Sequence, residues 1–274
     1  MRLNWRLAVG AAVLAALVIV AAAAPLLAPH DPMAQSLLDQ LLPPAWVNGG
    51  DPRYFLGTDT LGRDLLSRLI YGTRPALLVM VLGATLSGLV GVALGLVAGY
   101  FGGWLDTTVS RIVETFMSFP PMLLAIVLVA ALGPGLHAVV LSVVAVGWTR
   151  FCRVVRGEAI GLREREFVAS ARTFGMRDTR ILLRELLPNV APIVSVLMGL
   201  EMGRAIVVEA ILAFIGFSSS DIATWGAIIA DARSYLHQAW WAMTYPIAAL
   251  VVAVLALNAL GDGLREAFDP VLAR

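Results

Sequence analysis

Lysine is absent from this chain of 274 residues, in which all twenty basic residues are arginine. The absence excludes a nucleotide-binding loop of the Gly-x4-Gly-Lys-Ser/Thr type, which holds phosphate with its lysine. A single cysteine, Cys152, excludes an intramolecular disulfide and a cysteine-based metal cluster. The three histidines have no spacing that indicates a metal site, and no Ser/His/Asp set or His-Glu-x-x-His run is present. The sequence therefore predicts neither a catalytic residue nor a metal ligand.

Charge is also scarce. Only 14% of the residues are charged, against about 25% in ordinary soluble proteins, while 59% are hydrophobic and the mean hydropathy is +0.83. This composition predicts a polytopic membrane protein, which would contact lipid directly. The net charge of +1 gives no indication of nucleic-acid binding.

Six apolar runs are each close to the roughly 20 residues that cross a hydrocarbon core. They are Leu7–Leu27, Pro75–Phe101, Val109–Leu132, His137–Val155, Val190–Phe214 and Met243–Leu260. We therefore expect an all-α membrane protein with six transmembrane helices. The first run, with Ala22-Ala23-Ala24 near its end, could be a cleaved signal peptide. Its length of about 21 residues exceeds the usual 7–15-residue apolar region and favours a retained span.

The arginines predict the orientation. Nine of them lie between Arg150 and Arg184, after the fourth run, and arginine-dense short loops stay in the cytoplasm. Both termini are then cytoplasmic, in agreement with Arg2 and Arg6. The expected organisation is a first transmembrane helix in residues 1–28, an extracytoplasmic segment in 29–75 and a five-helix core in 76–274. That core contains a cytoplasmic loop at 156–188 and an extracytoplasmic loop at 216–242. Four extracytoplasmic arginines oppose the rule, but nearby aspartates nearly balance them.

A charged stretch, Leu162–Pro188, interrupts the apolar chain. Phe167, Ala171 and Phe174 are spaced to line one face of a short helix, and Gly175 is suited to the left-handed turn that ends it. Asp178 is placed to cap a second short helix that ends at Pro188. The residues alone leave two interpretations equally open: a docking surface for a soluble partner, or an amphipathic helix lying in lipid headgroups.

Ionisable residues inside the spans are costly and therefore functional candidates. Glu201 and Arg204 are three residues apart, as are Arg111 and Glu114, so each pair can neutralise itself on one helix face. Glu209 has no such partner. These residues are either local salt bridges or, for Glu201, Arg204 and Glu209, the lining of a polar passage suited to a zwitterionic peptide.

Two other features concern helix geometry. Pro120-Pro121 should kink or interrupt the third span, either as a packing kink or as the broken helix of a transport pathway. Small residues recur every four positions on the second span, and this pattern predicts a close helix–helix contact. They are Gly83, Ser87, Gly91 and Gly95.

Several motifs in order give the chain a family resemblance. It resembles the second (C-type) permease subunit of ATP-binding-cassette importers of the dipeptide, oligopeptide and nickel branch. The resemblance rests on Gly57-Thr58-Asp59, Gly62-Arg63-Asp64, Ala98–Gly103, Ser118-Phe119-Pro120, Glu209–Gly216, Trp225-Gly226, Asp231–Tyr235, Asn258–Arg265 and Asp269-Pro270.

The stretch Leu162–Pro188 resembles the cytoplasmic coupling loop of that family, Glu-Ala-Ala, three residues, Gly, nine residues, Ile-x-Leu-Pro. Ala169-Ser170-Ala171, Gly175 and Glu185-Leu186-Leu187-Pro188 keep the spacing, although Ala169 and Glu185 replace the leading glutamate and the isoleucine. The resemblance implies docking of an ATPase subunit. Phe167, Ala171 and Phe174 would be packed contacts, and Arg163, Arg165 and Glu166 a polar rim.

The resemblance also implies a type I importer permease fold in a bacterial inner membrane. The expected partners are a homologous second permease, two ATPase subunits that hold ATP and magnesium, and an external substrate-binding protein. The chain itself would be non-catalytic and hold no cofactor. Import of di- or oligopeptides is the expected function, nickel or another small solute is the alternative, and an ion-coupled secondary carrier is a further one. An intramembrane enzyme lacks a recognisable nucleophile and base.

Overall fold

The computed structural model describes residues 5–217 and 221–268, which form helices joined by turns and one longer polar segment. Within these residues, the only β-type pairing is an isolated bridge between Thr58 and Asp64. The prediction of an all-α protein is therefore confirmed. Arg2 and the Asp269-Pro270 pair, which entered the predictions above, lie outside the described residues.

Four helices are long and apolar enough to cross a membrane: α1 (Trp5–Ala22), α3 (Leu65–Phe101), α6 (Leu136–Arg163) and α11 (Trp240–Phe268). The predicted third span is not one straight helix, because α4 (Gly103–Ser118) and α5 (Pro121–Leu132) meet at 90°. The break falls at Phe119-Pro120, as the two prolines predict. Counting this pair as one broken span gives five. The predicted fifth run is occupied by α9 (Leu187–Ile215), a 29-residue helix that carries the three charges Glu201, Arg204 and Glu209.

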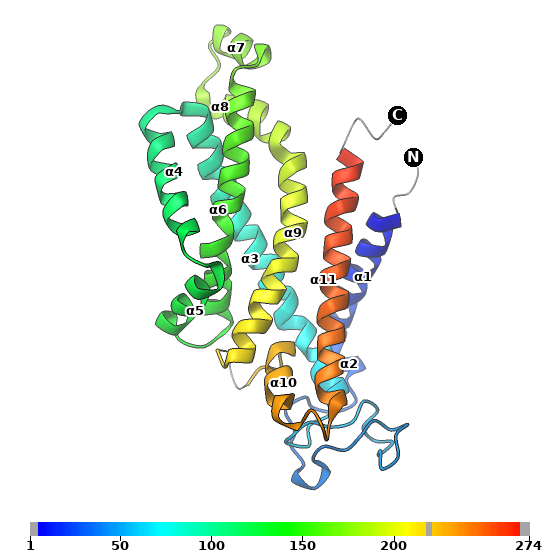
Figure 1. The fold of residues 1–274 in the computed structure, drawn as a ribbon. Helices are drawn as coiled ribbons and strands as arrows, with labels where there is room; N and C mark the ends of the chain where they lie inside the picture. The colour runs from blue at the N-terminus through cyan, green and yellow to red at the C-terminus, as the bar shows by residue number, and fades with distance from the viewer. Residues whose placement is uncertain (1–4, 218–220, 269–274) are drawn as a thin grey trace.

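The helices run roughly side by side, so the molecule has two distinct ends (Figure 1). The short helices α7 (Glu166–Thr173) and α8 (Asp178–Ile181) lie at one of them, together with the first turn of α1 and the last turns of α11. The polar segment 28–64 lies at the other, against α10 (Trp225–Ala232) and the short α2 (Ala24–Leu27). We refer to these as the α7 end and the α10 end. The residues of the predicted loops 156–188 and 216–242 therefore lie mainly at opposite ends of the molecule.

The second long helix begins ten residues earlier than predicted. The run was expected to start at Pro75 and the polar segment to extend to residue 75, but α3 starts at Leu65 and contains Pro75. Asp64 caps the helix, since its carboxylate accepts hydrogen bonds from the Ser67 backbone N–H at 2.9 Å and from the Ser67 hydroxyl at 2.5 Å. Pro75 removes one hydrogen bond from the first turns of a 37-residue helix, which neighbouring packing tolerates.

The predicted small-residue stripe on α3 is confirmed as a helix–helix contact. A Cβ atom added to Gly91 would meet the Trp148 carbonyl oxygen at 2.4 Å, and one on Gly95 would meet that of Cys152 at 2.7 Å. The Ser87 side chain is buried in the same interface. Only residues of this size let the backbones of α3 and α6 approach so closely. The α3–α6 pair is the most extensive helix–helix contact among the described residues.

Candidate functional site

Helix α7 stands at one tip of the molecule and ends as the sequence predicts (Figure 1). Gly175 has φ +73°, the left-handed conformation that favours glycine. The Gly175 N–H donates to the Arg172 carbonyl at 2.9 Å, and the Met176 N–H donates to that of Ala171 at 3.0 Å. This pair of hydrogen bonds is the Schellman arrangement, which satisfies the last carbonyls of a helix. A helix of only eight residues is thereby given a defined end.

The face that α7 buries differs from the predicted one. Val168 is fully buried and Ala171 nearly so, in an apolar cluster with Leu96 and Ile181. Phe167 is partly exposed and Phe174 is 87% exposed, so the two aromatic rings do not share a buried face with Ala171. The prediction treated Ala171 as an outward contact, whereas it packs on the chain's own core. A helix this short needs an internal anchor, and the small residues Val168 and Ala171 provide it.

The outward side of α7 carries most of the other residues predicted for docking. Arg165, Glu166, Phe167, Ala169, Ser170 and Phe174 are exposed, and we call them the exposed α7 surface. Arg163 lies at the end of α6 instead, where its guanidinium donates to the Gly99 carbonyl at 3.2 Å and to Glu164 at 2.9 Å. The predicted rim is therefore split, because Arg163 is bonded to the chain while Arg165 and Glu166 face outward.

A polar contact fixes the connection after α7 to the end of α3. The Tyr100 hydroxyl donates to the Asp178 carboxylate at 2.5 Å, and the Arg172 guanidinium lies 4.9 Å from the centre of the Tyr100 ring. Asp178 was predicted to cap the second short helix. It is instead the first residue of α8, and Arg177 holds the capping position without a side-chain hydrogen bond. Tyr100 gives α7 and α8 a common attachment to α3.

The second short helix does not end at Pro188, contrary to the prediction. Residues Leu182–Leu186 form a π-helical turn that joins α8 directly to α9, and Pro188 lies in the first turn of α9. The Leu187 N–H donates to the Leu182 carbonyl, five residues back, so the wider turn bypasses the hydrogen bond that proline cannot make. The Asn189 side-chain amide donates to the Glu185 carbonyl at 2.5 Å. The helical path from Asp178 to Ile215 is therefore continuous.

A second predicted group, the charges of α9, lies beside a cavity of about 420 Å³ between α5, α6, α9 and α11. Glu201 is buried, and its carboxylate accepts hydrogen bonds from the Arg150 guanidinium of α6 at 3.1 and 3.3 Å. Arg204 reaches the same carboxylate at 3.5 Å. We call this space the central cavity. The shorter of its two ion pairs, Arg150–Glu201, joins α6 to α9, whereas the sequence suggested the Glu201–Arg204 pair within one helix.

The other two predicted pathway residues do not line this cavity. Glu209 lies two turns beyond Glu201, buried within reach of the Thr224 hydroxyl, at the place where α10 packs on α9. Pro120 forms the break between α4 and α5, and the next residue, Pro121, is the one that lines the cavity. Arg150 was missed, because its contact with Glu201 spans 51 residues and no local spacing signals it.

At the α10 end, four charged residues form an ion-pair cluster. The Asp59 carboxylate accepts from the Arg63 guanidinium at 2.7 Å and from that of Arg68, and Arg63 also donates to Asp231 at 2.8 Å. Asp59, Arg63 and Arg68 are almost fully buried. These arginines, which opposed the expected charge distribution, are thus neutralised by direct partners. The cluster fastens the polar segment to the start of α3 and to α10.

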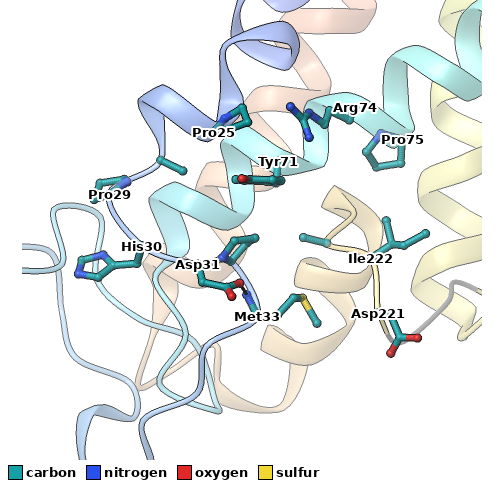
Figure 2. A pocket seen from close by; sticks show the side chains of 13 residues that line it. Pro25, Pro29, His30, Asp31, Met33, Tyr71, Arg74, Pro75, Asp221 and Ile222 are labelled. Carbon is teal, nitrogen blue, oxygen red and sulfur yellow. Dashed lines mark hydrogen bonds between the residues drawn. The ribbon is translucent and has the colours of Figure 1, made fainter.

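A second cavity, of about 640 Å³, lies between α2 with residues 28–33, the part of α3 around Arg74, and residues 221–223 before α10 (Figure 2). The Arg74 guanidinium lies 5.1 Å from the centre of the Tyr71 ring and donates to the Ala21 carbonyl at 2.8 Å. The Asp31 carboxylate accepts from the Met33 N–H at 2.8 Å, which closes a turn. The Arg74 guanidinium and the Asp31 carboxylate therefore bond to groups of the chain itself.

Comparison with known proteins supports the family predicted from the motifs. Residues 91–274 match the model of the binding-protein-dependent transport system inner membrane component family, and residues 2–44 match the N-terminal TM domain of oligopeptide transport permease C. The dipeptide transport system permease protein of Haemophilus influenzae is 37% identical over 93% of this chain and 86% of that protein. That of Bacillus subtilis is 37% identical over 97% and 82%.

Solved structures resemble the fold. The methionine ABC transporter MetNI in inward-facing conformations aligns with a TM-score of 0.61 at 20% identity, covering 74% of this chain and 97% of that one. An amino acid ABC transporter aligns with a TM-score of 0.57 at 17% identity, covering 73% and 94%.

Proposed function

The chain belongs to the family of binding-protein-dependent transport system inner membrane components, and we propose that it forms half of the passage of an ATP-driven peptide importer. Relatives at 37% identity over nearly the whole chain are dipeptide permeases, which supports peptides as the substrate class. The chain is a multi-pass inner membrane protein. Its passage would include the central cavity with Glu201 and Arg204, and the break between α4 and α5 at Pro120 beside it.

The observation that carries the proposal is the construction of the α7 end. A short helix with a defined end presents Phe174 outward on one side and is anchored by Val168 on the other. It is attached to a helical path that continues into α9 and reaches the central cavity. A rigid, packed element transmits displacement better than a flexible loop, because packed contacts shift between discrete arrangements. The exposed α7 surface would receive an ATPase subunit, and its movement would reorient α9.

The membrane arrangement we infer has six spans: α1, α3, the broken pair α4–α5, α6, α9 and α11. The α7 end with its arginines faces the cytoplasm, as do both termini, and the segment before α3 and the loop containing α10 face outward. Glu201 is acceptable inside such a bundle because it pairs with Arg150 and, more weakly, with Arg204.

The partners follow from this arrangement. A homologous second permease would complete the passage, and two ATPase subunits would bind ATP and magnesium and carry out hydrolysis, for which this chain has no lysine-containing phosphate loop. A substrate-binding protein would deliver the peptide at the α10 end. This chain would supply no catalytic group and hold no cofactor.

Uptake by proteoliposomes that contain the complete co-expressed complex and its binding protein tests the proposal. We expect ATP-dependent accumulation of a labelled dipeptide, and none without ATP. Longer peptides and nickel are offered in parallel, and ATP-dependent accumulation of nickel alone would keep the mechanism and refute the substrate. Uptake by this chain by itself, driven by an ion gradient, would contradict the proposal as a whole.

A further inference from the structure

The charges around the central cavity do not balance. Three of its fifteen lining residues are ionisable, the two arginines 150 and 204 and the single carboxylate of Glu201. Most of the other lining residues are apolar, and Asn258 of α11 adds a neutral amide. The described lining therefore carries one excess positive charge.

Glu201 gives most of its hydrogen-bonding capacity to Arg150. The Arg150 guanidinium contacts both carboxylate oxygens, at 3.1 and 3.3 Å, and the side chains of Arg150 and Glu201 are mostly buried. Arg204 contacts one oxygen at 3.5 Å, the outer limit of a hydrogen bond, and its side chain is 49% exposed. Among the described residues, Glu201 is the only acidic partner of Arg204. Arg204 therefore lines the cavity with a single long contact to an anion.

We propose that the central cavity binds a carboxylate group of the transported solute through Arg204, with Glu201 and Arg150 as positioning residues. The planar guanidinium matches a carboxylate with two parallel hydrogen bonds, and an arginine within a membrane bundle requires an anionic partner. A volume of about 420 Å³ falls in the range of small-ligand sites. The inference rests on the proposed function, in which the carboxyl terminus of a peptide is that group.

The cavity also limits what the ligand can be. Met122, Val146 and Val254 provide apolar walls on three different helices, which suits uncharged side chains next to the carboxylate. Because Glu201 is already bonded to Arg150, it is less available to a cationic ligand than its charge alone would suggest. The site should therefore discriminate between a peptide and its carboxyl-terminal amide.

The test uses a thiol as a probe of charge in the assembled complex, in phosphatidylcholine nanodiscs without binding protein or ATP. Asn258→Cys places the thiol on the cavity wall, and the native Cys152 is buried, so the unsubstituted complex gives the background. With each rate divided by that of the same reagent with a free thiol in solution, reaction with a negatively charged methanethiosulfonate reagent should exceed that with a positively charged one by roughly tenfold or more, the effect of a unit charge at close range. Adding Arg204→Gln should bring the ratio near one, and Arg204→Lys should preserve it.

Arg111→Gln is the matched control. Arg111 bonds Glu114 at 2.9 Å with the same three-residue spacing as Arg204 and Glu201, but it lies outside the cavity. This substitution should leave the ratio unchanged. Alanylalanine should slow the labelling of Asn258→Cys, whereas alanylalanine amide should slow it about tenfold less at equal concentration. Equal protection by the two peptides would overturn the inference. An absent charge preference would also overturn it, because Arg204 would then be neutralised by the second permease.

Uptake measured on the same preparation separates this inference from the proposed function. ATP-dependent dipeptide uptake together with equal protection by the amide would refute only the carboxylate site. Failure of ATP-dependent uptake in every variant, the unsubstituted complex included, would refute the importer itself.

Discussion

The two ends of the molecule use arginine in opposite ways. At the α10 end, Arg63 and Arg68 are buried and bonded to Asp59 and Asp231, so their charge holds the chain together. At the α7 end, Arg165 and the other arginines of α7 and α8 are exposed, and the chain is held by apolar residues such as Val168 together with the Tyr100 contacts. Removing one partner of a buried ion pair strongly destabilises the fold, so such a pair fixes the local geometry. Exposed charged groups contribute little to stability and remain available to a binding partner. The contrast indicates a fixed α10 end and a receptive α7 end.

Breaking the ion-pair cluster should have the largest effect. Asp59→Asn keeps the size of the side chain but leaves two buried guanidinium groups with only Asp231, and we expect a loss of roughly 3–5 kcal/mol in stability. Thermal unfolding of the detergent-solubilised complex and the yield of assembled complex measure it. Asp51→Asn is the control, since Asp51 pairs with Arg53 at the surface and should change little. Equal losses in the two variants would contradict the comparison.

The next effect should come from the turn that ends α7. Gly175→Val puts a β-branched residue at φ +73°, and no atom lies within 4 Å of the added Cβ, so the cost of about 1–2 kcal/mol is backbone strain alone. We expect transport-coupled ATP hydrolysis to fall several-fold while assembly falls less. Gly175→Asn tolerates the left-handed conformation and should retain most coupling. Normal coupled hydrolysis by an assembled Gly175→Val complex would remove the basis for a docking helix.

A pair of substitutions within α7 separates its two faces. Phe174→Ala should weaken association with the ATPase subunit and leave thermal unfolding unchanged, because the ring is exposed. Val168→Ala should destabilise the chain by about 1–2 kcal/mol, because it removes two buried methyl groups. Co-purification of the ATPase and thermal unfolding are measured for both. If Phe174→Ala left co-purification intact, the exposed α7 surface would not be the docking site.

The smallest effect concerns acid and the polar segment. Hydrogen bonds from Ser36 at 2.6 Å and Tyr54 at 3.1 Å, with Arg53 nearby, hold the pKa of Asp39 below its ordinary value of 3.8. Because folding lowers the pKa of Asp39, the ionised carboxylate stabilises the fold fully at a pH above 3.8. This contribution is lost as the pH falls through the lower pKa that Asp39 has in the folded state. Hydrogen exchange around residues 36–58, corrected for intrinsic rates, should quicken only in acid. Asp39→Asn should abolish that dependence, and an unchanged dependence would point to another group.

The sequence predicted features that depend on local chemistry. The apolar runs located the long helices, Gly175 marked the end of α7, and Pro120-Pro121 marked the break between α4 and α5. The stripe containing Gly91 and Gly95 indicated the α3–α6 contact, because close packing needs small residues whatever their partner. Each signal acts within a few residues of where it is read.

The features it missed depend on distant partners. No spacing connects Arg150 with Glu201, or Arg63 with Asp231, across the chain. The buried face of α7 was misassigned because apolar residues occupy more than one of its faces, and only the neighbouring cluster decides that Val168 is internal. Pro188 was taken as a helix end because proline normally is one. The π-helical turn that accommodates it has no clear sequence mark.

Helix α3 is longer than a bilayer requires, and this has a thermodynamic consequence. Arg68 and Tyr100 lie 32 residues apart on it, about 48 Å along a straight helix, whereas the hydrocarbon core measures about 30 Å. One helix therefore carries a member of the ion-pair cluster near its beginning and the attachment of α7 near its end. Suppose that two ligands, one at each face of the membrane, both bind more tightly to one position of α3. The first ligand then raises the affinity for the second by some factor. Reciprocity requires the second ligand to change the affinity for the first by the same factor.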